Sequence, residues 1–118
     1  MSTGPLEAGV AALQALDAET LVQLYVDGFV FEDVAAGETI TSREGLFGYF
    51  KALFSLPDVG FSDVGTFECG DKGAAEWIWS GTNRRGEAFS VKGVSIFEFA
   101  AAGIKRETIF YDPRPALS

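Results

Sequence analysis

The stretch AAEWIWSGTNRRGEAFSVKGVSIFEFA, residues 74–100, predicts two long β-strands joined by a tight turn at residues 83–86. In the first strand Trp77 and Trp79 share one face, because side chains alternate along a strand. The opposite face carries Ile78 among polar residues and is therefore only partly polar. A sheet that is apolar on both faces needs cover on both sides. We expect helices on one face and a second copy of the chain on the other.

More strands are predicted on both sides of this pair. Turn residues at 70–73 and 101–103 separate it from the strand-like stretches 59–69 and 103–112. Three consecutive hairpins then form a bent antiparallel meander. A further strand is predicted at residues 29–35, FVFEDVA.

Three helices are predicted in the N-terminal half of the chain. Pro5 suits the first position of a helix, and apolar residues follow it at helical spacing as far as Leu16. Asp17 is the expected N-cap of a helix over residues 18–26, and a third helix is expected to begin near Ser42. Helices followed by a meander are typical of an α+β fold with the helices on one face of the sheet. We expect them on the concave face, and the second subunit on the convex face.

The composition is that of one globular domain, and we expect residues 1–118 to form it. Eleven phenylalanines are many for this length and predict either a core of large rings or a cavity walled by them. The single cysteine, Cys69, cannot form an internal disulfide. The N-terminal residues lack the pattern of a signal peptide, and no apolar run approaches the ~18 residues of a membrane span. We therefore expect a cytoplasmic protein.

The charge and the absence of histidine exclude several functions. A net charge of −8 repels phosphate backbones and anionic lipids, so no nucleic-acid or membrane partner is expected. Without histidine there is no histidine metal site and no imidazole base for a serine or cysteine nucleophile. Any general base must be Asp, Glu, Lys or Tyr.

Two aspartates are the candidate acid/base groups. In FVFED, residues 29–33, Asp33 shares the parity of Phe29 and Phe31, which places a carboxylate in an apolar row. Asp112 ends the last predicted strand. A carboxylate that lines an aromatic cavity has a raised pKa and can remove an acidic C–H proton near pH 7.

The order of these elements resembles the SnoaL-like branch of the nuclear transport factor 2-like superfamily. The resemblance depends mainly on WIWSGT at 77–82, KGVSIFEF at 92–99 and FYD at 110–112. It implies a cone-shaped α+β barrel, in which a curved sheet surrounds a deep pocket plugged by the N-terminal helices. Homodimers are usual in that superfamily. By this resemblance Asp33 matches the base of the steroid isomerases, and Asp112 matches the acid/base aspartate of the polyketide cyclases.

The sequence also departs from the enzymes of this superfamily. Around Gly9 and at Ser95 it lacks the tyrosine and aspartate that form the oxyanion hole of the steroid isomerases. Trp77, Trp79 and Gly81 stand on the strand that carries an Arg and an Asp in the epoxide hydrolases. The resemblance therefore favours the polyketide cyclases.

We interpret the protein as a cofactor-independent and metal-independent acid/base enzyme of the aldol cyclase or isomerase type, acting on an apolar carbonyl compound. Two alternatives stay open: a non-catalytic binder of a small hydrophobic ligand, and a dimeric scaffold module. Asp33 could instead cap a turn, and Asp112 could be a solvated partner of Arg106 or Arg114. The predicted catalytic residues are Asp33 and Asp112, and the predicted substrate-binding residues are Phe29, Phe31, Tyr49, Trp77, Trp79, Ser95, Phe97 and Phe110.

Overall fold

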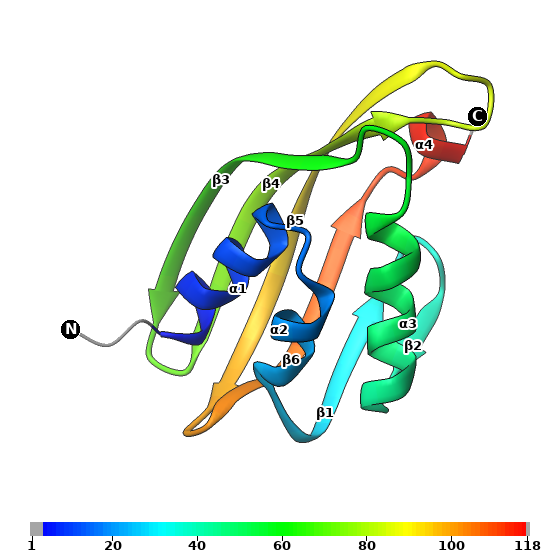
Figure 1. Ribbon diagram of the computed structural model, residues 1–118. Helices are drawn as coiled ribbons and strands as arrows, with labels where there is room; N and C mark the ends of the chain where they lie inside the picture. The colour runs from blue at the N-terminus through cyan, green and yellow to red at the C-terminus, as the bar shows by residue number, and fades with distance from the viewer. Residues whose placement is uncertain (1–3, 118) are drawn as a thin grey trace.

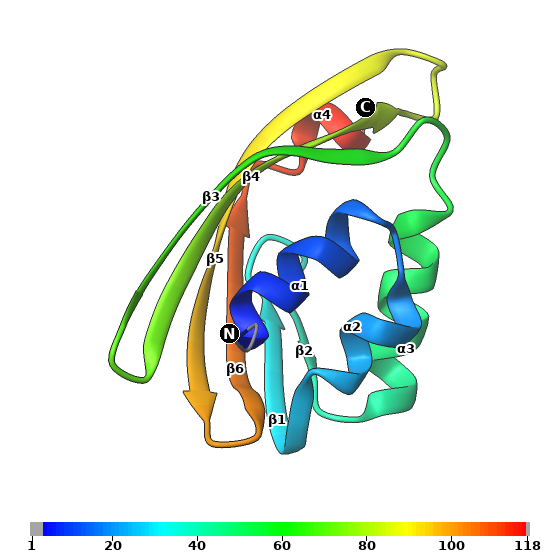
Figure 2. The same ribbon diagram turned by 60° about the vertical axis from the view of Figure 1, so that its left-hand side comes forward.

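The chain forms a curved β-sheet with three helices packed against its concave face (Figure 1). The computed structural model describes residues 4–117. Figure 2 shows the sheet as one bent layer, with α1, α2 and α3 together on the other side of a shared interior. The elements in chain order are α1 (Pro5–Gln14), α2 (Ala18–Gln23), β1 (Tyr25–Asp33), β2 (Glu38–Ile40), α3 (Arg43–Phe54), β3 (Gly60–Cys69), β4 (Lys72–Thr82), β5 (Ala88–Ala100), β6 (Gly103–Tyr111) and α4 (Arg114–Leu117).

In the described part of the chain the sheet has six strands, in the order β2-β1-β6-β5-β4-β3. The three predicted hairpins are confirmed, because β3, β4, β5 and β6 pair antiparallel in sequence order. The prediction of an antiparallel sheet is wrong for one pair of strands. Strand β1 runs parallel to β6, with Phe31 opposite Glu107. Within residues 4–117 it stays an open curved sheet rather than a closed barrel, with β2 and β3 at its edges. The predicted α+β fold class is confirmed in this mixed form.

The two predicted helix caps are present. The Asp17 side chain accepts a hydrogen bond from the backbone amide of Thr20 (3.1 Å), and the Ser42 hydroxyl accepts one from Gly45 (3.0 Å). Each bond satisfies one of the amides that the first turn of a helix leaves without a partner. The caps therefore fix where α2 and α3 begin.

Helix α2 is shorter than predicted. It ends at Gln23 rather than at residue 26, and Tyr25 already begins β1. The reason is a tertiary contact, because the backbone amide of Ile104 donates to the carbonyl of Leu24 (2.8 Å) and draws this segment into the sheet. The short strand β2 and the terminal helix α4 were not predicted either.

The core lies between the sheet and the helices, whereas the convex face keeps apolar side chains exposed. On that face Ile96 is 43% and Phe110 is 45% exposed. Helix α3 and strand β1 enclose the interior at one end with Leu46, Phe29 and Phe31, which are almost fully buried. No helix within residues 4–117 is long and apolar enough to cross a membrane.

Candidate functional site

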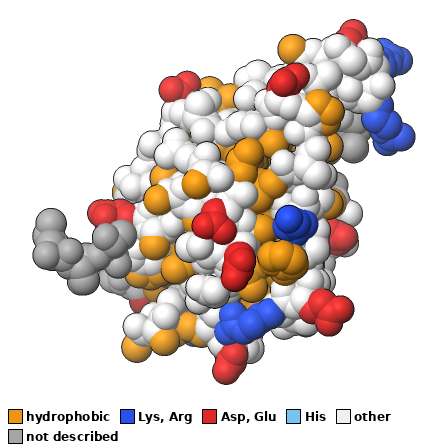
Figure 3. Space-filling model, in the orientation of Figure 1, with side chains coloured by type: hydrophobic (Ala, Val, Ile, Leu, Met, Phe, Trp, Pro, Cys, Tyr) orange, Lys and Arg blue, Asp and Glu red, His pale blue; other side chains and the backbone are white. Residues whose placement is uncertain are grey.

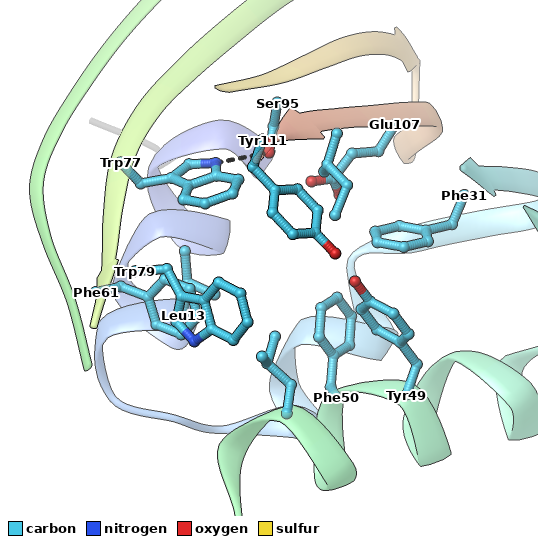
Figure 4. A pocket seen from close by; sticks show the side chains of 12 residues that line it. Leu13, Phe31, Tyr49, Phe50, Phe61, Trp77, Trp79, Ser95, Glu107 and Tyr111 are labelled. Carbon is cyan, nitrogen blue, oxygen red and sulfur yellow. Dashed lines mark hydrogen bonds between the residues drawn. The ribbon is translucent and has the colours of Figure 1, made fainter. Parts of the chain in front are cut away.

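A small cavity lies between the sheet and the helices (Figure 4), and we call it the aromatic pocket. Its volume is about 60 Å³. A water molecule needs roughly 10–15 Å³ on this measure, so the pocket has room for about four to six water-sized groups. Ser95 and Glu107 are its non-aromatic polar wall residues. Its walls are mainly aromatic, from Phe31 of β1, Tyr49 and Phe50 of α3, Phe61 of β3, Trp77 and Trp79 of β4, and Tyr111 of β6.

A second cavity of about 50 Å³ adjoins the pocket on the side of α1. Phe97 and Tyr25 are among its wall residues. Trp77, Ser95 and Glu107 line both cavities, so these three side chains form part of the partition between them. The Glu107 carboxyl therefore lies near the centre of the interior.

Glu107 is an ionisable group whose pKa burial brings close to neutral pH. Its side chain is 7% exposed, and it accepts hydrogen bonds from the hydroxyl groups of Tyr25 and Ser95. Burial raises the pKa of Glu107 to about 7, although the two hydrogen bonds lower it in part. A carboxyl with this pKa is half protonated near neutral pH, so it can both take up and release a proton.

The donors around Glu107 hold it in place. Trp77 Nε1 donates to Ser95 Oγ (3.0 Å), and Ser95 donates in turn to Glu107. Burial raises the pKa of Tyr25 well above its ordinary value, so its hydroxyl stays protonated as a donor. Glu107 is thus oriented from β1 on one side and from β4 and β5 on the other.

Asp33 is buried beside the aromatic pocket rather than on its wall. It is 1% exposed, and its Oδ2 accepts from the hydroxyls of Tyr49 (2.8 Å) and Tyr111 (2.9 Å). Its Oδ1 accepts from the amide of Ala36 (3.1 Å), which confirms the alternative that Asp33 caps a turn. Burial raises the pKa of Tyr49 and of Tyr111 far above the usual range, and the nearby Asp33 raises it further. Both hydroxyls therefore stay protonated and donate to Asp33.

The tyrosine bonds to Asp33 make a stability prediction. Tyr49→Phe keeps the ring that packs on Phe31 (centroids 5.0 Å apart) and removes one donor from a buried carboxylate. We expect a loss of about 2 kcal/mol in the free energy of unfolding, measured by urea denaturation. Tyr111→Phe should cost a similar amount, since its bond is equivalent. An unchanged free energy in both variants would contradict an anchoring role for Asp33.

The structure corrects the expected position of Asp112 and Phe110 at the pocket. Asp112 is exposed, and its Oδ2 accepts from Arg114 Nη2 (2.7 Å), as the alternative interpretation predicted. The hydrogen bonds from Arg114 lower the pKa of Asp112 to about 2. The physical reason is strand parity, because Glu107 and Tyr111 of β6 face the helices and the alternate residues face outward.

The other predicted residues fall into two groups. Phe29 packs in the core against Tyr25, with ring centroids 5.3 Å apart, and Phe97 lines the second cavity. The remaining ones line the aromatic pocket: Phe31, Tyr49, Trp77, Trp79 and Ser95.

The sequence interpretation missed Glu107. The signal for Glu107 was present, since it shares the parity of Ile109 and Tyr111 just as Asp33 shares that of Phe31. Tyr25, which donates to Glu107, was left out of the predicted site because it was assigned to a helix, where a tyrosine hydroxyl more often lies at the surface.

Two further features concern the ligands of the site. Trp79 Nε1 is a buried donor with no hydrogen-bond partner within the described chain. Such a group calls for a ligand atom or a water molecule as its acceptor. Among residues 4–117, no three His, Cys, Asp or Glu side chains gather in a way that could hold a metal ion.

Comparison with known proteins gives a family match and many similar folds. Residues 6–107 match the family model of the SnoaL-like domain. No curated protein sequence matches the chain.

Three solved structures illustrate the similarity of fold. A protein of Catenulispora acidiphila DSM 44928 with a ketosteroid isomerase-like fold, in complex with trimethylamine, is 20% identical, with a TM-score of 0.83 over 97% of this chain and 91% of its own. A protein of Pseudomonas putida KT2440, provisionally named a polyketide cyclase, is 15% identical, with a TM-score of 0.82 over 99% and 100%. A nuclear transport factor 2-like protein of Burkholderia thailandensis E264 is 18% identical, with a TM-score of 0.85 over 97% and 95%. At these identities the similarity establishes the fold alone.

Proposed function

The chain belongs to the SnoaL-like domain family, and from this premise we propose that it is a cofactor-independent enzyme that moves a proton on a small carbonyl compound. Glu107, rather than Asp33 or Asp112, is the acid/base group in this proposal. One observation carries it: a buried carboxyl with a pKa of about 7 lies on the wall of an aromatic pocket.

The geometry supports proton abstraction next to a carbonyl group. The ionised Glu107 removes a proton from the carbon next to the carbonyl, and negative charge develops on the carbonyl oxygen. Trp79 lines the same pocket, and we assign its Nε1, a buried donor without a partner in the described chain, to this oxygen. Glu107 then returns the proton at another atom, or the enolate carbon bonds to a second carbonyl carbon, whose oxygen takes the proton back from Glu107. Tyr25 and Ser95 keep the carboxyl oriented during both steps.

The size of the pocket restricts the substrate. A volume of about 60 Å³ accepts a compound of a few heavy atoms, or only the reacting end of a larger one. The trimethylamine complex of the protein from Catenulispora acidiphila supports a small ligand, and the name of the protein from Pseudomonas putida supports carbonyl chemistry.

Non-catalytic binding is the second candidate. It is favoured by the hydrogen bonds that already engage the hydroxyls of Tyr25, Tyr49 and Tyr111, which leave few donors for a reacting oxygen.

In both cases we propose that a second copy of the chain covers Ile96 and Phe110 on the convex face.

Hydrogen–deuterium exchange tests the enzymatic proposal without knowledge of the full reaction. Small ketones, aldehydes and 1,3-dicarbonyl compounds are incubated with the protein in D₂O, and loss of the C–H signal is followed by NMR. We expect Glu107→Gln to reduce the catalysed exchange by about 100-fold or more. Below pH 7 the wild-type rate should rise with pH, because the base must be ionised.

Asp112→Asn is the matched control, since it removes an exposed carboxylate outside the pocket, and it should exchange like wild type. An equal exchange rate in Glu107→Gln and wild type would refute the role of Glu107. Binding without any exchange would favour the non-catalytic candidate.

A further inference from the structure

We propose that the aromatic pocket selects a compact organic cation, an alkylammonium group of about four or five heavy atoms, and that Glu107 is its counter-ion. This inference goes beyond the proposed function and shares with it only that Glu107 faces a ligand in this pocket; the organic cation is a second class of ligand, distinct from the carbonyl compound.

The ring faces of the pocket suit a cation. Trp77 and Trp79 contact Tyr111, with ring centroids 6.2 and 5.8 Å apart, and Phe61 contacts Trp77 at 6.2 Å. The pocket is thus enclosed by rings from several elements. An ammonium group within about 6 Å of such ring centroids is attracted by their negative faces, most strongly by those of tryptophan.

Apart from Trp79 Nε1, the hydrogen-bond donors that line the pocket among residues 4–117 already have acceptors. Tyr49 and Tyr111 donate to Asp33, and their hydroxyl groups point toward one another in Figure 4. Ser95 donates to Glu107, and Trp77 Nε1 donates to Ser95. These groups therefore present oxygen lone pairs and ring surfaces to a ligand rather than N–H or O–H bonds. Such a lining favours positive charge over negative charge.

The titratable groups that face Glu107 are acidic or neutral. Asp33 faces this region from β1, and the hydroxyls of Tyr25, Tyr49 and Tyr111 face it from β1, α3 and β6 and stay protonated. The residues of α1, α2, β3, β4 and β5 that line the two cavities are uncharged, and among residues 4–117 no lysine or arginine lines either cavity. Acidic side chains are spread over the helix side of the molecule (Figure 3), and the chain has a net charge of −8. This field attracts cations toward the pocket.

Binding of a cation is coupled to the proton on Glu107. At pH 6 about a tenth of a carboxyl with a pKa of about 7 is ionised, and at pH 8 about nine tenths is. A permanent cation binds the ionised form, so its affinity should rise about tenfold between these two pH values. A neutral ligand of the same size has no such dependence on pH.

The test compares two probes of five heavy atoms, tetramethylammonium chloride and tert-butanol. Each is titrated into the full chain at pH 6 and at pH 8 and at constant ionic strength, and binding is followed by the NMR signals of Trp77 and Trp79. We expect tetramethylammonium to bind about tenfold more tightly at pH 8 than at pH 6, and tert-butanol to bind weakly at both. Glu107→Gln should remove the pH dependence, and Asp112→Asn should keep it.

The outcomes separate this inference from the proposed function. If tert-butanol binds as tightly as tetramethylammonium at pH 8, the cation preference is wrong. If exchange of a neutral carbonyl compound depends on Glu107 but tetramethylammonium does not bind, the inference fails and the proposed enzyme stands. If tetramethylammonium binds with the expected pH dependence and no compound exchanges, the cation site stands and the enzyme fails. The comparison of the two pH values within wild type does not depend on whether a variant folds.

Discussion

The free energy of unfolding of the wild-type protein should fall by about 3 kcal/mol between pH 4.5 and pH 7 because of Glu107, and Glu107→Gln should abolish this fall. Burial raises the pKa of Glu107 from 4.5 to about 7, so the folded protein holds a proton that the unfolded chain has already released in this range. Stability from this group is complete below pH 4.5 and is lost as the pH rises through 7. A shift of this size corresponds to about 3 kcal/mol. Glutamine keeps the shape and has no proton to lose.

Urea denaturation at pH 4.5, 6 and 8 checks this. Because other groups titrate too, the relevant quantity is the difference in the free energy of unfolding between wild type and the variant. We expect the free energy of unfolding of Glu107→Gln, relative to wild type, to increase as the pH rises, so that the variant is the more stable protein at pH 8. Asp112→Asn serves as the control, and its stability should fall across this range as that of wild type does. Parallel curves for wild type and Glu107→Gln would show that Glu107 titrates normally.

This cost at neutral pH has a bearing on function. A buried carboxyl that weakens the fold at pH 7 is not explained by stability, since an uncharged side chain would suit the same place. Glu107 also lies between two cavities rather than in a solid core. The combination is what an acid/base or counter-ion role requires.

Local patterns in the sequence were sufficient to predict much of the fold. Residues 83–86 predicted the turn between β4 and β5, and Asp17 and Ser42 predicted the starts of α2 and α3. These predictions are confirmed because turn and cap chemistry depends on neighbouring residues. The parallel pairing of β1 with β6 depends on contacts between distant segments, such as Ile104 with Leu24. No pattern within either segment encodes that contact.

The site was predicted in part for the same reason. Trp77 and Trp79 were placed correctly, because one parity of β4 is clearly the more aromatic. In the predicted strand 103–112 both parities carry an aromatic residue and a carboxylate, so the sequence did not decide between Glu107 with Tyr111 and Phe110 with Asp112. The structure decides it through the register with β5, which turns Glu107 toward the helices.

Gly93→Ala should both destabilise the protein and close the aromatic pocket. Gly93 lies opposite Trp77 in the β4–β5 pairing, and the indole ring covers the place where a side chain would start. A Cβ at Gly93 would lie 2.3 Å from Cη2, 2.5 Å from Cζ3 and 2.8 Å from Cζ2 of Trp77. The ring must therefore move, and its bond to Ser95 (3.0 Å) is lost with it. We expect a loss of about 3 kcal/mol, the upper range for overpacking, in urea denaturation.

Gly60→Ala is the matched control, because Gly60 also lies on a strand and its added Cβ would find only Ser80 Oγ, at 3.8 Å. Its free energy of unfolding should stay within about 1 kcal/mol of wild type. Trp77→Phe, added to Gly93→Ala, removes the larger ring and should recover part of the lost stability. Equal stability of Gly93→Ala and Gly60→Ala would mean that Trp77 has room to shift, and the pocket would then be adaptable in size. If the pocket is rigid instead, Gly93→Ala loses ligand binding together with stability, because the displaced indole occupies the space beside Glu107.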